Sequence, residues 1–386
     1  MPSNDGPSAA DQQLIDHAAR HGLAVTAKQF EVWRRAGLLP GNVPGGGLGR
    51  GRGSTSSPPP ESFDLVLALA RRAGRGKRPT DLALLLFADG HPVPEATVRA
   101  AFRAAVHAAV LPGEDDGLND DPGLEERVDH VAGRLAEAGQ AFVLVPARVR
   151  RIDERIARIL GELPEEMAEL DENTEPTPMT PQDASLAAVT ATLGGTMSVQ
   201  EIGDLLRGMN PGTAAQPFAS LVETTQQDTP QAADLAMADD GSLTVLPEGD
   251  ARDQLRGLAD TASMEDLRVG WRTALQVREW ALALCDQVEA ELDDGQPGEA
   301  VILWLTGRGL PSGMSVLETL RERRWAPSSG AFSALLLLFQ RQMYEVLDGL
   351  VPGCQWPVLE MPGVLAPPVR DLILTAVQRT TPAQED

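Results

Sequence analysis

The sequence predicts a mainly α-helical (all-α) protein in which a compact N-terminal domain is followed by an acidic region of several helices. Apolar residues recur at the helical spacings of three, four and seven along most of the chain, whereas the alternating pattern of β-strands is nearly absent. Because 386 residues exceed what one hydrophobic core usually serves, we expect two or three domains.

Positive charge is concentrated near the N-terminus, although the whole chain carries a formal net charge of −23. Between Arg20 and Arg103 there are 13 Lys and Arg residues against 6 Asp and Glu residues, a local net charge of +7. From Leu111 onward 20 basic residues stand against 47 acidic ones, a net charge of −27. A cationic module on an anionic body favours a phosphate binder, and it also allows the module to dock on the chain's own acidic region.

Polar, turn-rich stretches divide the chain into segments. An acidic run over 113–123 ends the basic part, and two further polar stretches follow over 171–183 and 226–250. The predicted segments are a disordered lead over 1–9, a first domain over 10–111, an acidic linker over 112–123, a helical region over 124–225, a linker over 226–252 and a helical C-terminal domain over 253–386.

The C-terminal domain is expected to contain one long central helix that begins near Ser263. Its larger apolar residues form two stripes. The first stripe consists of Leu267, Trp271, Leu275 and Leu282, and the second of Val277, Trp280, Leu284 and Val288. Two apolar stripes on one helix predict that it is buried from two sides.

The most informative local pattern lies between Thr26 and Pro40. Thr26 is a good cap for a helix whose apolar residues Phe30 and Trp33 lie on one side, and Gly37 supplies the left-handed residue that ends a helix. An earlier helix over 10–20 is separated from it by a short turn containing glycine. Two short helices joined in this way have the order of a helix-turn-helix.

Residues 14–110 resemble the winged helix-turn-helix domain of the MerR family of transcription regulators. The residues that carry the resemblance are Thr26, Lys28, Phe30, Trp33, Arg35, Gly37, Leu38, Leu39 and Pro40. The resemblance implies that this domain binds double-stranded DNA, that Lys28 and Gln29 face the major groove and that Arg35 supports a contact with the DNA backbone. It also implies a glycine-containing wing with arginines, followed by two further helices.

Two other groups of basic residues lie in the same domain. Within the stretch 41–60, the run 45–55 alternates glycine with Arg50 and Arg52, and we interpret this run either as the wing or as a flexible linker. The basic run over 71–78 is either a phosphate-contacting surface or a solvated loop. The candidate DNA-binding residues are therefore Thr26, Lys28, Gln29, Arg34, Arg35, Arg50, Arg52, Arg71, Arg72, Arg75, Lys77 and Arg78.

Catalytic, metal and cofactor sites are not expected. The last 256 residues contain no histidine, and the glycine-rich stretches match neither the dinucleotide fingerprint nor the P-loop. His17 and His21 have the spacing of metal ligands on a helix, but no third ligand is evident, so we interpret them as helix-surface residues. Cys285 and Cys354 lie too far apart and too far from histidines to indicate a zinc site.

No segment predicts membrane insertion. The longest apolar run, over 82–88, is far shorter than the roughly 20 residues that a membrane-spanning helix needs. The N-terminal residues lack the basic and apolar regions of a secretory signal, so we expect a cytoplasmic protein.

Three hypotheses of function follow from the sequence. The first is a transcription regulator that binds double-stranded DNA and uses its acidic helical region to form a homodimer, to bind an effector or to recruit another protein. The second is a protein-interaction module with a repurposed helix-turn-helix fold, because Glu31 stands where the family commonly has Arg and the whole chain is acidic. The third is an enzyme whose site lies among the carboxylates of the acidic region.

Overall fold

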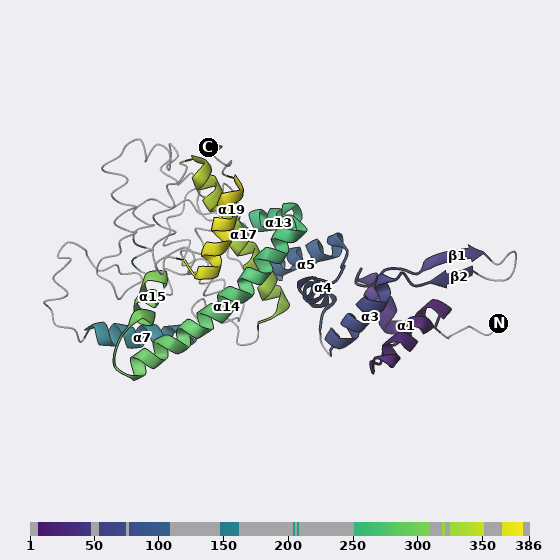
Figure 1. Cartoon of the computed structure of the whole chain (residues 1–386), viewed down its shortest axis with the longest axis horizontal. Coiled ribbons are helices and arrows are strands. Elements are labelled where there is room, and N and C mark those ends of the chain that lie inside the picture. The colour runs from purple at the N-terminus through teal and green to yellow at the C-terminus, as the bar shows by residue number, and fades with distance from the viewer. Residues whose placement is uncertain are drawn as a thin grey trace, which may run out of the picture. The chain divides into compact units, whose positions relative to one another are not determined.

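The computed structural model describes residues 7–47, 54–74, 77–108, 147–161, 251–308, 325–350 and 365–380, together with positions 204, 207, 319 and 320. Helices predominate in these parts of the chain (Figure 1), which confirms the prediction of a mainly helical protein. The chain divides into two compact units. The first gathers residues 1–108 with the short segments 263–268 and 326–332, and the second contains the rest. The predicted linker over 112–123 and most of 124–250 lie outside the described residues.

The first unit begins with two short helices, α1 (Ala9–Arg20) and α2 (Ala27–Arg35). Helix α1 ends at Gly22, which has a φ of 72°, and the Leu23 N–H closes the turn on the Ala18 carbonyl at 3.0 Å. This left-handed residue allows the chain to reverse within a few residues, as the sequence predicted.

Helix α2 ends at Gly37, where two constraints require glycine. Its φ is 70°, and a Cβ at this position would lie 2.4 Å from the Thr97 hydroxyl oxygen. That hydroxyl donates a hydrogen bond of 3.2 Å to the Gly37 carbonyl. Thr97 belongs to helix α5 (Glu95–Ala108), so the end of α2 is fixed against a helix about 60 residues further along the chain.

Two strands follow the helix pair. Strand β1 (Val43–Gly47) pairs with strand β2 (Ser54–Ser57) as an antiparallel hairpin (Figure 1). Val43 is opposite Ser57 and Pro44 is opposite Ser56, whereas Gly47 is opposite Ser54. Strand β1 therefore has one more residue than β2 between these pairs, which is the arrangement of a β-bulge. The flanks of the glycine-rich stretch are thus ordered as a hairpin.

Helices α3 (Glu61–Arg72) and α4 (Pro79–Ala88) complete the first unit together with α5. Helix α3 packs on α1 and α4, and α4 packs on α5. The Phe87 and Phe102 rings meet edge to face with their centroids 5.9 Å apart. The Arg268 guanidinium, in the first turn of α14 (Met264–Asp293), lies 5.0 Å from the centroid of the Phe87 ring. The Arg268 cation therefore lies over the Phe87 ring in a cation–π contact.

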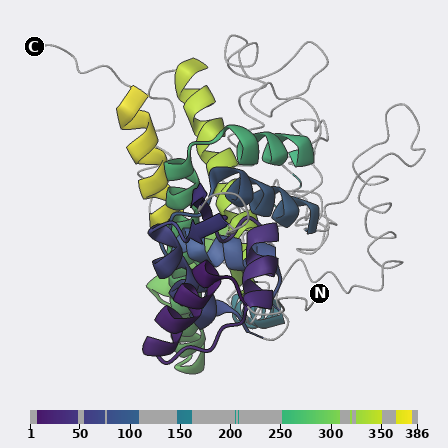
Figure 2. The same cartoon turned by 90° about the vertical axis from the view of Figure 1, so that its right-hand side faces the viewer.

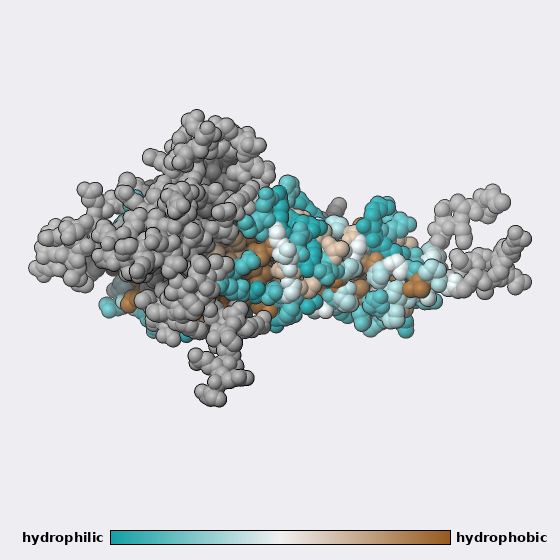
Figure 3. All heavy atoms as spheres, turned by 90° about the horizontal axis from the view of Figure 1, so that it is seen from above, coloured by the Kyte–Doolittle hydropathy of each residue, from teal (hydrophilic) through white to brown (hydrophobic). Residues whose placement is uncertain are grey.

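The second unit contains most of α14, with α7 (Ala147–Gly161), α13 (Ala251–Thr261), α15 (Glu299–Arg308), α17 (Pro327–Leu350) and α19 (Pro367–Thr380). One core cluster joins α14 to α7 and α15, and another joins α14 to α17 and α19. Figure 2 gives a second view of these helices. Seen as spheres, the coloured face of the described residues is mostly hydrophilic with separate apolar patches (Figure 3).

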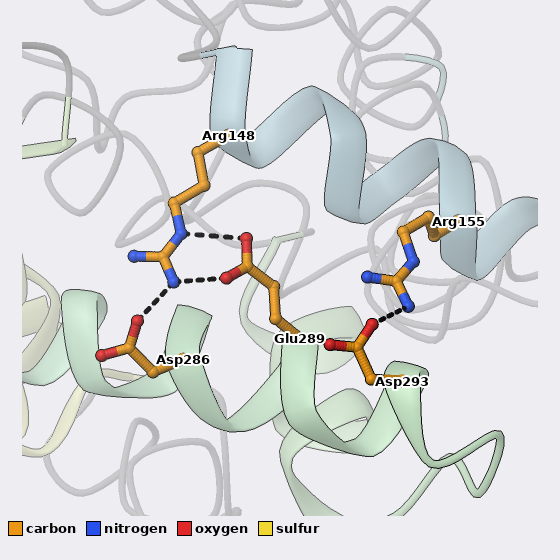
Figure 4. A network of polar contacts seen from close by, with 5 residues as sticks. All are labelled: Arg148, Arg155, Asp286, Glu289 and Asp293. Atoms are coloured by element: carbon orange, nitrogen blue, oxygen red, sulfur yellow. Dashed lines mark hydrogen bonds and ion pairs between the residues drawn. The ribbon is translucent and has the colours of Figure 1, made fainter.

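Ion pairs reinforce the contact between α7 and α14 (Figure 4). The Arg148 guanidinium bonds to both carboxylate oxygens of Glu289, at 3.0 and 2.7 Å, and also contacts Asp286. Further along the same two helices, Arg155 of α7 pairs with Asp293 of α14 at 2.7 Å. Because the acidic residues of α14 face arginines here, part of the negative charge of this region is neutralised within the fold.

The predicted burial of α14 is correct only in part. Leu267 and Trp271 are buried, as are Val277, Leu284 and Val288, but Leu275 and Leu282 are 39% and 36% exposed. Residues four apart on an α-helix are separated by about 40° more than a full turn. Residues related by steps of four therefore move gradually around the helix and leave the buried face. The observed face instead runs through residues such as Ala274, Ala281 and Cys285.

Gly270 allows α14 and α17 to approach closely. A Cβ at this position would lie 3.0 Å from the Ala334 carbonyl oxygen and 3.1 Å from the Leu338 side chain. We expect Gly270→Ala to destabilise the protein by about 1–3 kcal/mol, because overpacking outweighs the gain in helix propensity of up to about 1 kcal/mol. Thermal melts of the full chain measure this.

The matched control is Gly257→Ala in α13, where an added Cβ meets nothing within 4 Å. This variant should melt at or above the wild-type temperature, because only helix propensity changes. If Gly270→Ala is as stable as Gly257→Ala, the close approach of α14 and α17 is wrong.

Candidate nucleic-acid interface

The solvent-facing side of α2 carries the residues at positions 28, 31, 32 and 35. These are Lys28, Glu31, Val32 and Arg35, all exposed, and their spacing of three, four and seven places them on one face of the helix. The opposite face is buried through Phe30 and Trp33, whose rings pack with centroids 5.9 Å apart. Helix α2 thus presents an exposed face that has a cation at each end and Glu31 and the apolar Val32 between them, while its aromatic side anchors it in the core.

Thr26 and Gln29 form a reciprocal cap at the start of α2. The Gln29 N–H donates to the Thr26 hydroxyl at 3.3 Å, and the Thr26 N–H donates to the Gln29 side-chain oxygen at 2.8 Å. Both side chains were predicted as DNA-binding residues. In this structure the side-chain oxygen of Gln29 accepts the capping hydrogen bond from the Thr26 N–H. A base contact by Gln29 would therefore have to use its amide NH₂ group or break the cap.

Arg34 joins three elements of the first unit. Its guanidinium forms an ion pair of 2.6 Å with Asp11 of α1 and donates hydrogen bonds to the Asn42 side-chain oxygen at 3.0 Å and to the Pro40 carbonyl at 3.4 Å. Asn42 immediately precedes β1. We call Arg34, Asp11 and Asn42 the Arg34 latch, because they tie the helix pair to the base of the hairpin. Arg34 points into these contacts, whereas its neighbour Arg35 is exposed.

The latch lowers the pKa of Asp11. Burial alone would raise the pKa, but hydrogen bonds from Arg34, Ser8 and Asn42 and the positive charge of Arg34 outweigh it. The carboxylate therefore stays ionised well into acidic solution, and the ion pair with Arg34 persists with it.

The second predicted group of cations lies at the connection between α3 and α4. Arg71, Lys77 and Arg78 are exposed, whereas Arg72 forms an ion pair of 2.7 Å with Asp89 at the end of α4. Arg72 is thus engaged within the fold, and the other three face solvent. Arg50, Arg52 and Arg75, which were predicted with them, lie outside the described residues.

His17 is packed in a way that the sequence did not predict. Its ring meets the Phe63 ring edge to face at 5.1 Å and lies 4.9 Å from the His21 ring. The His17 Nε2 is buried with no hydrogen-bond partner. Burial, together with electrostatic repulsion from the neighbouring His21 and Arg20 side chains, lowers the pKa of His17. His17 is therefore a packing residue between α1 and α3, and only His21 fits the predicted surface position.

No metal site or membrane span stands out in the described parts of the chain. Their His, Cys, Asp and Glu side chains form no group of three or more that is placed to hold a metal ion. None of their helices has both the length and the apolar character needed to cross a bilayer.

Comparisons of the chain with protein-family models, with curated proteins and with solved structures found no match. Any functional conclusion for this chain therefore depends on its own residues and geometry.

Arg34→Ala and Arg35→Ala are a matched pair of substitutions on one helix. We expect Arg34→Ala to lower the free energy of unfolding by about 1–3 kcal/mol, because it leaves the part-buried Asp11 carboxylate without its ion-pair partner and strongest hydrogen-bond donor. Arg35→Ala should change it by less than about 0.5 kcal/mol, because the side chain is exposed. Denaturant unfolding of the full chain measures both changes. If the two substitutions lower the free energy of unfolding equally, the Arg34 latch has no structural role.

Asp11→Asn tests the latch through its pH dependence. The pKa of Asp11 in the folded protein lies below its ordinary value of 3.8. The stability that the ionised Asp11 contributes is therefore complete above pH 3.8 and is lost as the pH falls through the pKa of the folded protein. The wild type should be more stable than Asp11→Asn at pH 7, and the difference should shrink towards pH 3. A difference that is constant with pH would show that Asp11 acts without its charge.

Proposed function

We propose that the first unit is a winged helix-turn-helix domain that binds double-stranded DNA, and that the protein is a transcription regulator. The observation that carries the proposal is the Arg34 latch. It holds α1, α2 and the base of the β1–β2 hairpin together, while α2 exposes a polar face with Lys28 and Arg35 at its ends. A helix-turn-helix uses its second helix in the major groove, and a wing is a hairpin that follows such a pair.

In the proposed complex, α2 enters the major groove with its exposed face towards the base edges. Lys28, in the first turn, is placed to reach bases or phosphates, and Arg35, in the last turn, to reach a phosphate. Arg50 and Arg52 lie in the sequence between the two strands of the hairpin, and in the proposed complex they contact the DNA backbone. Arg71, Lys77 and Arg78 are further candidates for phosphate contacts.

The acidic helical region has a separate task in this proposal. Its net charge of −27 from Leu111 onward repels DNA phosphates, so it is unsuited to contact DNA itself. We assign it to formation of a homodimer, to binding of an effector or to recruitment of another protein. Long paired helices such as α14 and α17 offer surfaces for each of these tasks.

A protein-binding module is the competing function, and one observation favours it. Val32 on α2 and Val43 at the start of β1 are 45% and 52% exposed, and Glu31 is exposed beside Val32. Exposed apolar side chains are also a feature of protein interfaces, and the Glu31 carboxylate repels phosphates. The two functions predict different partners for the full chain, which are duplex DNA in the first case and another protein in the second.

Selection of bound duplexes from a random pool separates these functions. The full-length protein should retain duplex DNA at low salt and enrich a sequence motif, and a palindromic motif would indicate binding as a two-fold dimer. Retention without enrichment would indicate binding through phosphates alone. No retention at low salt would contradict the proposal and favour a protein partner.

Arg35→Ala should weaken binding to selected and random duplexes alike, because a phosphate contact carries no sequence information. The slope of log K against log salt should become flatter by about 0.9 for this single contact. The matched control is Arg370→Ala on α19, which removes an equally exposed arginine from the second unit and should leave affinity nearly unchanged or improve it slightly. If both variants lost the same affinity for DNA, the loss would come from the change in net charge and not from a contact made by Arg35.

Arg50→Ala with Arg52→Ala tests the hairpin as a wing. These are the only charged residues between Pro40 and Pro60. If both reach phosphates, the salt slope should be flatter by about 1.8, with melting temperature unchanged. An unchanged slope in a folded double variant would show that the hairpin takes no part in DNA binding.

A further inference from the structure

Two residues on the exposed face of α2 are not explained by attraction to phosphates. Glu31 carries a negative charge, which phosphates repel, and Val32 has no charge or hydrogen-bonding group. Both are exposed between Lys28 and Arg35 on the same face of the helix, and Val32 is 45% exposed. A surface that only tracked the DNA backbone would not place these two side chains at its centre.

We propose that Glu31 and Val32 read base edges in the major groove: Glu31 accepts a hydrogen bond from the N4 amino group of a cytosine, and Val32 packs on the 5-methyl group of a thymine. The inference rests on the proposed function and adds the bases that α2 prefers. It follows from the chemistry of the groove, where the cytosine amino group is a donor and the thymine methyl group is the one apolar feature.

The surroundings of the two residues favour this assignment. Lys28 and Arg35, one turn before and one turn after, offset the repulsion between the Glu31 carboxylate and the DNA backbone. Glu31 and Val32 are adjacent in sequence and therefore point about 100° apart around the helix, which suits contacts to neighbouring base pairs. Val32 is β-branched, so packing on a methyl group costs it little rotamer entropy.

The position of α2 supplies the rigidity that base reading needs. Phe30 and Trp33 anchor its inner face, the Thr26–Gln29 cap fixes its first turn, and Gly37 against Thr97 fixes its end. Since the inner face cannot turn outward without exposing two aromatic rings, Glu31 and Val32 keep their place on the outer face.

The test for Val32 uses the full-length protein and the duplex that the wild type selects. Each thymine is replaced in turn by deoxyuridine, which removes only the 5-methyl group. At one position the wild type should lose about fourfold in affinity, which corresponds to one buried methyl-sized group. Val32→Ala should bind the thymine duplex more weakly and lose nothing further on the deoxyuridine duplex. Leu275→Ala, which changes an exposed apolar residue of α14 outside the first unit, should keep the full fourfold loss.

The test for Glu31 repeats the duplex selection with Glu31→Gln. Glutamine pairs with the N6 and N7 atoms of adenine, so the preference at one base pair should move from cytosine towards adenine while the rest of the motif is kept. The same motif in both proteins would overturn the assignment of Glu31, and equal deoxyuridine losses in wild type and Val32→Ala would overturn that of Val32. Failure of the wild type to enrich any motif would instead remove sequence-specific binding, and the inference with it.

Discussion

The ion pair between Arg34 and Asp11 is the contact on which the arrangement of the first unit depends. It joins α1 to α2, and the same guanidinium reaches Asn42 and the Pro40 carbonyl ahead of β1. The hairpin strands consist mainly of glycine and serine, which bury little apolar surface. We therefore expect the hydrogen bonds from Arg34 to Asn42 and to the Pro40 carbonyl to fix much of the orientation of the hairpin relative to α1 and α2.

Two adjacent arginines illustrate what sequence alone does not decide. Arg34 and Arg35 have the same chemistry and both were predicted to bind DNA, yet Arg34 turns to Asp11 and Asn42 whereas Arg35 faces solvent. One step along a helix rotates a side chain by about 100°, which is enough to separate an internal contact from an exposed one. The partners of Arg34 lie 23 and 8 positions away, so no local pattern identifies them.

Local signals predicted much of the first unit, because caps and stops depend on neighbouring residues. Thr26 caps α2, and Gly22 and Gly37 end the two helices, as expected. The strands over 43–47 and 54–57 were not predicted from the residue pattern, because Gly and Ser have low strand propensity and their pairing is non-local, although the family resemblance implied a wing in this stretch. The packing of His17 on Phe63 and the exposure of Leu275 and Leu282 also depend on which helices meet.

In the proposed complex, α2 and the hairpin meet DNA together as one surface. Hydrogen–deuterium exchange of the full-length protein, with and without duplex DNA at low salt, measures which segments are covered. We expect slower exchange in the peptides that cover α2 (Ala27–Arg35) and the hairpin (residues 43–57), with α19 (Pro367–Thr380) unchanged. Protection confined to the helices of the acidic region, or no protection at all, would contradict it.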